Sequence, residues 1–323
     1  MAATSTTVPS APSAPSAPTY WQRLRGGDEV AYLITFIAAA AILLVTALLV
    51  YELYLNSDLS RAKFGWKFLI TSTWDPVNDE FGALPFIYGT VVTSFLALLI
   101  GIPLGVGAAV FLAELAPPMI SDSLTFLIEL LAAVPSVIFG LLGIFVLVPI
   151  LRYIEPALRS VLGWTPLFSG PFYGVSLFSA GVVMSVMIIP FIISISREVI
   201  LAVPGDQREA ALALGATRWE TVWDVVLPYA KKGIMGSIFL ALARSLGETM
   251  AVTMVIGNDP KIKASLFAPG YSIAAVIANE FTEATGKIYT SALIELGLVL
   301  FALTIVINGV ARLMVMGADK YKA

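Results

Sequence analysis

Two residues of opposite charge, Arg244 and Glu248, stand inside a largely apolar stretch that runs from residue 230 to residue 256. If that stretch is one continuous helix, the spacing of four residues places both side chains on the same face, one turn apart. Charge inside a membrane span is costly, and it marks a functional site by default. These two residues are therefore the first candidates for chemistry in the chain.

Two interpretations of the pair stay open. In the first, Arg244 and Glu248 form an ion pair that neutralises itself and orients the helix, although Arg before Glu is the weaker order for such a pair. In the second, Arg244 lines a pathway and Glu248 holds or shields it when no substrate is bound. A guanidinium stays charged and donates to two oxygens at once, which suits an oxyanion such as phosphate. Thr249 and Thr253 would then add hydroxyl donors nearby.

Composition excludes most other chemistry. The chain contains no Cys and no His, which removes thiol chemistry, imidazole acid–base catalysis and the common zinc ligands. We assign Glu129 and Glu295, the other charges near or within apolar segments, to helix anchoring or interhelical bonding, because a carboxylate repels an anion. The net charge is -3 and no basic patch is present, so nucleic acid is excluded as a partner.

The balance of apolar and charged residues predicts an integral membrane protein. Of 323 residues, 58% are hydrophobic and only 13% are charged, against roughly 25% charged in soluble domains. An apolar helix of about 20 residues spans a bilayer, and the segments that pass this test run approximately over residues 30–55, 85–113, 127–150, 172–196, 230–256 and 287–316. The predicted fold is all-α with six transmembrane helices and both termini on one side.

Two regions differ in character from these segments. Residues 1–20 are rich in Ala, Ser, Pro and Thr, which predicts a disordered tail ahead of one transmembrane domain over residues 21–323. Residues 197–229 form a polar loop with a high density of Lys and Arg in the loop and at its junction with the fifth segment. The positive-inside rule therefore places this loop and both termini in the cytoplasm.

The polar loop predicts a helix, a sharp turn and a second helix. Pro204 suits a first helical turn and Gly215 a left-handed stop, while Thr217 and Glu220 have the spacing of a capping box. Pro228 ends the second element or turns the chain into the fifth segment. Two roles compete, an interfacial linker and a rigid knob that enters a partner's groove. The helix pattern alone favours the linker.

The spacing within the loop reverses that preference. Glu209-Ala210-Ala211 is followed after three residues by Gly215, and after nine more by Val225 and then Leu227-Pro228. This resembles the EAA loop of the permeases of ATP-binding-cassette importers, with Val225 where the family pattern has Ile. The resemblance implies the MetI-like, type I permease fold, and a coupling helix seated in a cleft of an ATPase subunit. The implied coupling residues are Glu209, Ala210, Ala211, Gly215, Leu227 and Pro228.

The energy source is expected on another polypeptide. The chain has no G-x-x-x-x-G-K-[ST] phosphate loop, so we expect ATP and Mg to be bound by a separate ATPase subunit. No cofactor is expected in this chain. It also lacks a recognisable arrangement of paired carboxylates or an activated nucleophile, and we do not expect it to be an enzyme.

Three further segments resemble the PstC family of permeases from bacterial high-affinity phosphate importers. They are residues 81–90 (FGALPFIYGT), 128–137 (IELLAAVPSV) and 243–249 (ARSLGET), and the likeness covers about residues 30–316. It implies phosphate as the substrate, with Arg244 and Glu248 in the pathway, in a bacterial inner membrane. The implied partners are a PstA-like permease, a dimer of a PstB-like ATPase and a PstS-like phosphate-binding protein.

Some alternatives remain at this point. The loops around Trp66, Trp74 and Tyr271 are candidates for receiving the binding protein, or they form interfacial aromatic belts. The coupling loop indicates an ATPase partner but does not identify the substrate. An importer of another oxyanion or solute is therefore the second hypothesis. A stand-alone secondary carrier is the third, and it would be expected to show inverted repeats and a relay of ionisable residues.

Overall fold

The computed structural model describes residues 28–320, with side chains from Glu29 to Leu313. The tail expected over residues 1–20 lies outside this range. Six helices of the described part are long and apolar enough to cross a membrane, which confirms the predicted six-span, all-α architecture. The spans are Glu29–Asn56, Leu84–Leu115, Ser136–Leu162, Leu177–Leu201, Arg218–Leu246 and Lys287–Leu313.

The chain divides into two compact units between Glu52 and Leu53. The described part of the first unit is most of helix α2 (Asp28–Asn56). Its side chains are exposed throughout from Val30 to Leu49. A helix that is apolar on all sides is suited to a lipid environment, so this unit has the character expected of the first span.

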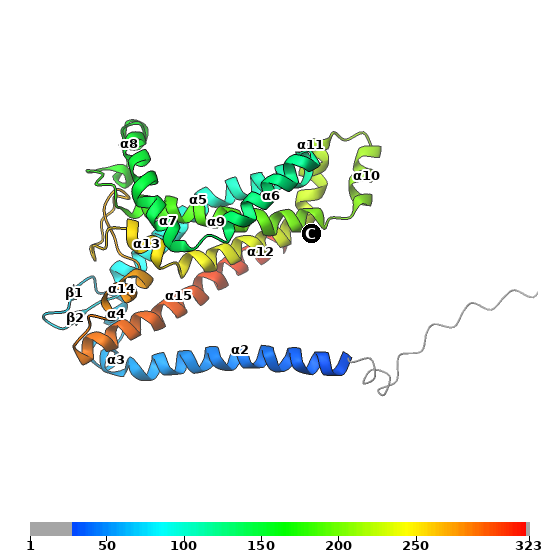
Figure 1. The fold of residues 1–323 in the computed structure, drawn as a ribbon. Coiled ribbons are helices and arrows are strands. Elements are labelled where there is room, and N and C mark those ends of the chain that lie inside the picture. The colour runs from blue at the N-terminus through cyan, green and yellow to red at the C-terminus, as the bar shows by residue number, and fades with distance from the viewer. Residues whose placement is uncertain (1–27, 321–323) are drawn as a thin grey trace, which may run out of the picture. The chain divides into compact units, whose positions relative to one another are not determined.

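The second unit is built around the packing of α5 (Leu84–Val110) against α9 (Leu177–Leu201), with α12 (Leu227–Leu246) packed on both (Figure 1). Glycines let α5 approach closely. A Cβ added at Gly105 would lie 2.8 Å from the side chain of Ile192, and one at Gly101 would lie 3.0 Å from Ile188. Small residues at such positions permit close contact between helix backbones in a membrane.

The third span differs from its prediction. Instead of one helix over residues 127–150, α6 (Pro118–Ala132) covers most of the gap between the second and third predicted segments (residues 114–126) and ends just before Pro135. The span follows as α7 (Ser136–Leu142), the π-helix η2 (Gly143–Leu147) and α8 (Val148–Leu162). Proline disfavours helical dihedrals in the residue before it, which explains why the apolar run is divided at this point.

The fifth span also differs. After α10 (Gly205–Ala213), helical structure resumes in α11 (Arg218–Glu220) and continues through the π-helix η4 (Thr221–Val226) into α12. Helix α12 ends at Leu246, and a separate short helix, α13 (Met250–Val255), follows. The predicted continuous helix over residues 230–256 is therefore wrong, because the chain is interrupted at residues 247–249.

The end of the second unit far from α10 holds the short elements (Figure 1). They are α3 (Asp58–Phe64), α4 (Lys67–Ile70), the antiparallel strands β1 (Trp74–Asp75) and β2 (Glu80–Phe81), the 3-10 turn η3 (Pro166–Phe168), α14 (Ile273–Glu280) and the start of α15 (Lys287–Lys320). Buried aromatic and aliphatic side chains, among them Phe68, Phe81 and Phe86, form a second core there. We call this region the aromatic end.

Candidate translocation and coupling sites

Arg244 lies in the last turn of α12, and its side chain is exposed. The next two residues, Ser245 and Leu246, are buried, so Arg244 projects away from the core of this chain. Within residues 28–313 its guanidinium forms no ion pair, with Glu248 or with any other carboxylate. The group is available to an anion or to another subunit.

Glu248 belongs to the interruption of the fifth span and not to the helix that carries Arg244. Its Oε1 accepts a hydrogen bond of 3.2 Å from the backbone N–H of Ala251, in the first turn of α13. A carboxylate at a helix N-terminus satisfies a backbone donor that has no partner within the helix. The expectation that the two charges share one face of one helix is wrong, and the intrahelical ion pair does not form.

The two threonines make backbone contacts. Thr249 Oγ1 donates to the carbonyl of Gly247 at 3.3 Å, and Thr253 Oγ1 donates to the carbonyl of Thr249 at 2.7 Å. In this conformation both hydroxyl protons are used by the backbone around the interruption. Thr249 and Thr253 therefore stabilise the break, and a role as donors to an anion would require their hydroxyls to rotate.

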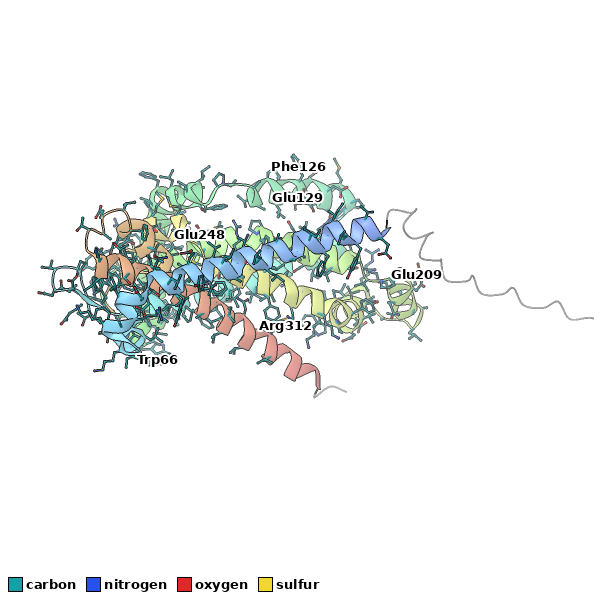
Figure 2. All side chains as sticks on the ribbon, turned by 90° about the horizontal axis from the view of Figure 1, so that it is seen from below. Trp66, Phe126, Glu129, Glu209, Glu248 and Arg312 are labelled. Atoms are coloured by element: carbon teal, nitrogen blue, oxygen red, sulfur yellow. The ribbon has the colours of Figure 1, made fainter. Side chains whose placement is uncertain are left out.

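Glu129 and Glu295, the two other carboxylates considered in the sequence, do not join this site. Glu129 is exposed on α6, where Figure 2 shows it at the edge of the unit, and its side chain has no partner in the described part of the chain. Glu295 on α15 is 6% exposed, and its Oε2 is buried without a hydrogen-bond partner. Of the two roles predicted for Glu129, helix anchoring and interhelical bonding, the second is not seen among the described residues.

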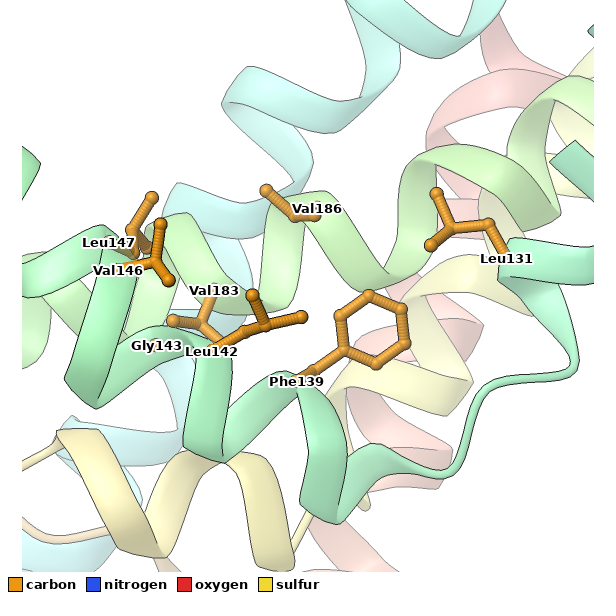
Figure 3. A pocket seen from close by; sticks show the side chains of 8 residues that line it. All are labelled: Leu131, Phe139, Leu142, Gly143, Val146, Leu147, Val183 and Val186. Atoms are coloured by element: carbon orange, nitrogen blue, oxygen red, sulfur yellow. The ribbon is translucent and has the colours of Figure 1, made fainter. Parts of the chain in front are cut away.

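A cavity of about 170 Å³ lies between α6, α7, η2 and α9 (Figure 3). Its wall is made of apolar side chains such as Phe139, Leu142 and Val183, together with Gly143. An anion would lose its hydration there without gaining a donor. This cavity is therefore not a binding site for an oxyanion.

The helix, turn and second helix predicted for the polar loop are confirmed. Helix α10 begins after Pro204 and has no buried residue, so Glu209 and Ala210 are exposed. Figure 2 shows Glu209 at the far end of the second unit from Trp66. Gly215 follows with φ of +90°, a left-handed conformation that favours glycine. The N–H of Gly215 donates to the carbonyl of Leu212 at 3.0 Å, and that of Ala216 to Ala211 at 3.2 Å. These two bonds define a Schellman C-cap.

The second helix begins with the predicted capping box. Thr217 Oγ1 accepts from the N–H of Glu220 at 3.3 Å, and Glu220 Oε2 accepts from the N–H of Thr217 at 2.7 Å. In the later part of the motif, Leu227 is half-buried and Pro228 is exposed. Leu227 packs with the buried Val226 in a core cluster, and Pro228 lies in the first turn of α12.

One pair of charged residues was not predicted from the sequence. Arg208, the residue before Glu209, binds Glu114 of the π-helix η1 (Phe111–Leu115), at the end of the second span. The Nη2–Oε1 distance is 2.7 Å and the Nε–Oε1 distance is 3.0 Å. The partners are 94 residues apart in sequence, so no local pattern could have joined them.

The aromatic end contains Trp66, Trp74 and Tyr271, whose loops are candidates for docking. Tyr271 is 4% exposed, and burial raises the pKa of its hydroxyl to about 12. The indole N–H of Trp74 donates to Glu280 at 2.8 Å, and its ring packs against Phe81 and Phe86. These two aromatic residues belong to a core and are not free for a partner, whereas Trp66 is 86% exposed.

Comparison with known proteins places this geometry in a family. Residues 101–317 match the family described as binding-protein-dependent transport system inner membrane component. A phosphate transport system permease protein PstC from Mesorhizobium japonicum is 46% identical over 90% of this chain and 91% of its own length. The chain belongs to the PstC family. A second PstC protein, from Pasteurella multocida, is 47% identical over 87% of this chain and 89% of its own length.

The fold agrees with this PstC membership. A chain of a bacterial ABC transporter involved in the import of the acidic polysaccharide alginate superposes with a TM-score of 0.51, covering 90% of this chain and 98% of its own, at 16% identity. At that identity the likeness concerns the fold alone. The PstC-family chain is thus a multi-pass inner-membrane permease of the MetI-like, type I importer fold. Such a permease works together with other components of an ABC importer.

Proposed function

We propose that this chain is the permease subunit of an ATP-driven phosphate importer, that it forms half of the translocation pathway, and that a separate ATPase drives it. The names of its relatives support phosphate as the substrate, since two PstC proteins are 46% and 47% identical to it. The observation that carries the proposal is the exposed, unpaired guanidinium of Arg244 at the interruption of the fifth span.

Arg244 has the properties that anion passage requires. Its guanidinium remains charged, and its donor fork can bind two phosphate oxygens at once. Because the described residues supply no carboxylate to neutralise it, its attraction is available to an anion. Glu248 is held at the first turn of α13, close in sequence to Arg244. Rearrangement of this interruption would change whether the carboxylate shields the guanidinium.

The partners follow from the same proposal. A PstA-like permease would supply the second half of the pathway, and a PstS-like protein would deliver phosphate. A PstB-like ATPase dimer, which would hold ATP and Mg, would receive the exposed face of α10. Glu209, Ala210, Ala211 and Gly215 would contact or shape that interface, and Leu227 and Pro228 would anchor it to the fifth span. The loop and both termini would then be cytoplasmic, and no cofactor would be bound by this chain.

The test is phosphate uptake by the complete reconstituted complex. We expect Arg244→Gln to abolish uptake while the complex still assembles, and Arg244→Lys to retain part of it, because Lys keeps the charge but loses the fork. Lys263→Gln is a suitable control, since Lys263 pairs with Asp259 at 3.3 Å in a loop. Normal uptake by Arg244→Gln would refute the assignment of this residue to the pathway.

Competition between oxyanions for uptake identifies the substrate. If phosphate is the substrate, excess arsenate should compete with labelled phosphate, because the two anions share shape and charge, whereas sulfate and molybdate should not. Strong competition by sulfate or molybdate would favour the alternative, an importer of another oxyanion. Failure of the wild-type complex to take up any oxyanion would favour an importer of a different solute.

A further inference from the structure

The side chain of Arg208 joins three segments at the base of the coupling helix. It pairs with Glu114 of η1, and its Nη2 also donates to the carbonyl of Ile200 at 2.8 Å, while Nη1 donates to the carbonyl of Val203. Ile200 lies in the last turn of α9, where helix carbonyls have no partner within the helix. One guanidinium therefore connects α10 with the ends of the second and fourth spans.

This link stands out because α10 has little other attachment. The helix stands apart from the bundle in Figure 1, and none of its residues is buried. It contacts η4 and is joined through the backbone to α9 and α11. In contrast, the side chains of Arg208 and Glu114 are only 22% and 12% exposed. Arg208 thus extends from an otherwise exposed part of α10 into the body of the protein.

The geometry suits transmission of force better than simple surface stabilisation. Exposed ion pairs contribute little and are screened by salt, but this pair is largely shielded. The guanidinium uses several of its directional donors on fixed acceptors, which a lysine ammonium would not reproduce. Its position relative to η1 and α9 is therefore defined in more than one direction.

The segments that the pair joins also share a packed apolar cluster. Val110 and Leu112 from the second span, Ile200 and Val203 from the end of the fourth, and Val226 from η4 are buried together in it. Close-packed interiors have low compressibility and transmit displacement. Glu114 sits on a π-helix, a form that often occurs at functional sites. A displacement of α10 would be passed through Arg208 to both spans.

We propose that the Arg208–Glu114 pair is the joint that carries movement of the coupling helix to the second and fourth spans. The inference rests on the proposed function, since it assigns a path for the motion that ATP hydrolysis would produce. Arg208 is a positioning residue in this role and does not contact substrate or nucleotide. The pair keeps hydrolysis and transport in a fixed ratio.

The role of the Arg208–Glu114 pair is tested by the ratio of phosphate transported to ATP hydrolysed. In the reconstituted complex, we expect Glu114→Gln and Arg208→Gln to lower the ratio roughly five- to tenfold, the lower end of ordinary coupling between sites, while hydrolysis continues. A purely structural role would lower assembly, hydrolysis and transport together and leave the ratio unchanged. The control is Asp259→Asn, which removes the loop ion pair with Lys263 and should leave the ratio at the wild-type value.

A reversible cross-link provides the second measurement. The chain has no native Cys, so Glu114→Cys/Arg208→Cys can be bridged specifically by a bis-methanethiosulfonate reagent, with partner subunits made free of Cys. We expect bridging to restore the ratio and reduction to abolish it again. A wild-type ratio in both Gln variants, or a bridged complex that stays uncoupled, would overturn the inference. Absence of phosphate uptake by the wild-type complex would instead refute the proposed function.

Discussion

Glu248 accepts a hydrogen bond from the backbone N–H of Ala251 in α13, whereas Arg244, four residues before Glu248, remains exposed on the preceding helix, α12. The relationship between the two charges is therefore set by a break in the fifth span. In secondary transporters, interrupted helices expose backbone groups and helix ends that bind substrates and ions. Because of the break, Arg244 forms no ion pair with Glu248, and the Glu248 carboxylate is held instead by the backbone of α13.

Removing the carboxylate of Glu248 should destabilise the interruption. We expect Glu248→Ala to lower the free energy of unfolding by about 1 kcal/mol, the usual cost of losing a helix cap, and Glu248→Gln to lower it less, because the amide oxygen still accepts. Thermal unfolding of the purified complex measures the effect. Glu129→Ala is the matched control, since Glu129 is exposed and its side chain has no partner in the described region. Equal melting temperatures for Glu248→Ala and wild type would contradict the capping role.

The turn after α10 should not tolerate a branched side chain. Gly215 has φ of +90° with open space around it, so the cost of Gly215→Val is backbone strain and not a clash. We expect a loss of about 1 to 2 kcal/mol and weaker binding of the ATPase, measured by co-purification. Gly205→Ala, at the start of the same helix and also in open space, should bind the ATPase normally. Equal retention of the ATPase by both variants would count against a shaped coupling turn.

Local signals explain which parts of the fold could be predicted. Gly215, Thr217 and Glu220 act within a few residues of one another, so their turn and capping box were visible in the sequence. The six spans follow from composition, because an apolar run of sufficient length has few alternatives to a membrane helix. Both predictions rest on short stretches of sequence, and neither requires a contact between distant residues.

The remaining features depend on longer-range relationships or on competing local preferences. Gly247 gave no clear warning of the break, because glycine is common inside transmembrane helices. The sequence predicts one helix over residues 127–150, and the separation of α6 from α7 at Pro135 was not foreseen. The bond between Arg208 and Glu114 joins residues 94 positions apart, so only the packed structure could show it.

The contact between the second and fourth spans should be sensitive to a single methyl group. A Cβ at Gly105 would lie 2.8 Å from Ile192, so we expect Gly105→Ala to lower the free energy of unfolding by about 1 to 3 kcal/mol through overpacking. Gly107, two residues further along α5, has no neighbouring atom within 4 Å of such a Cβ. Gly107→Ala should therefore be neutral or slightly stabilising, because Ala is the better helix former. Thermal unfolding separates the two, and equal melting temperatures would show that α5 and α9 are not closely packed.

The proposed orientation predicts opposite labelling of two equally exposed positions. Val77, between β1 and β2, is 91% exposed, and Leu214, just after α10, is 90% exposed. Because the chain has no native Cys, Val77→Cys and Leu214→Cys each introduce a single thiol. In intact cells that lack the outer membrane and the ATPase subunit, a membrane-impermeant maleimide should label Val77→Cys at once and Leu214→Cys only after permeabilisation. The reverse pattern would place the coupling loop outside the cell, where an ATPase could not reach it, and would exclude the coupling role of α10.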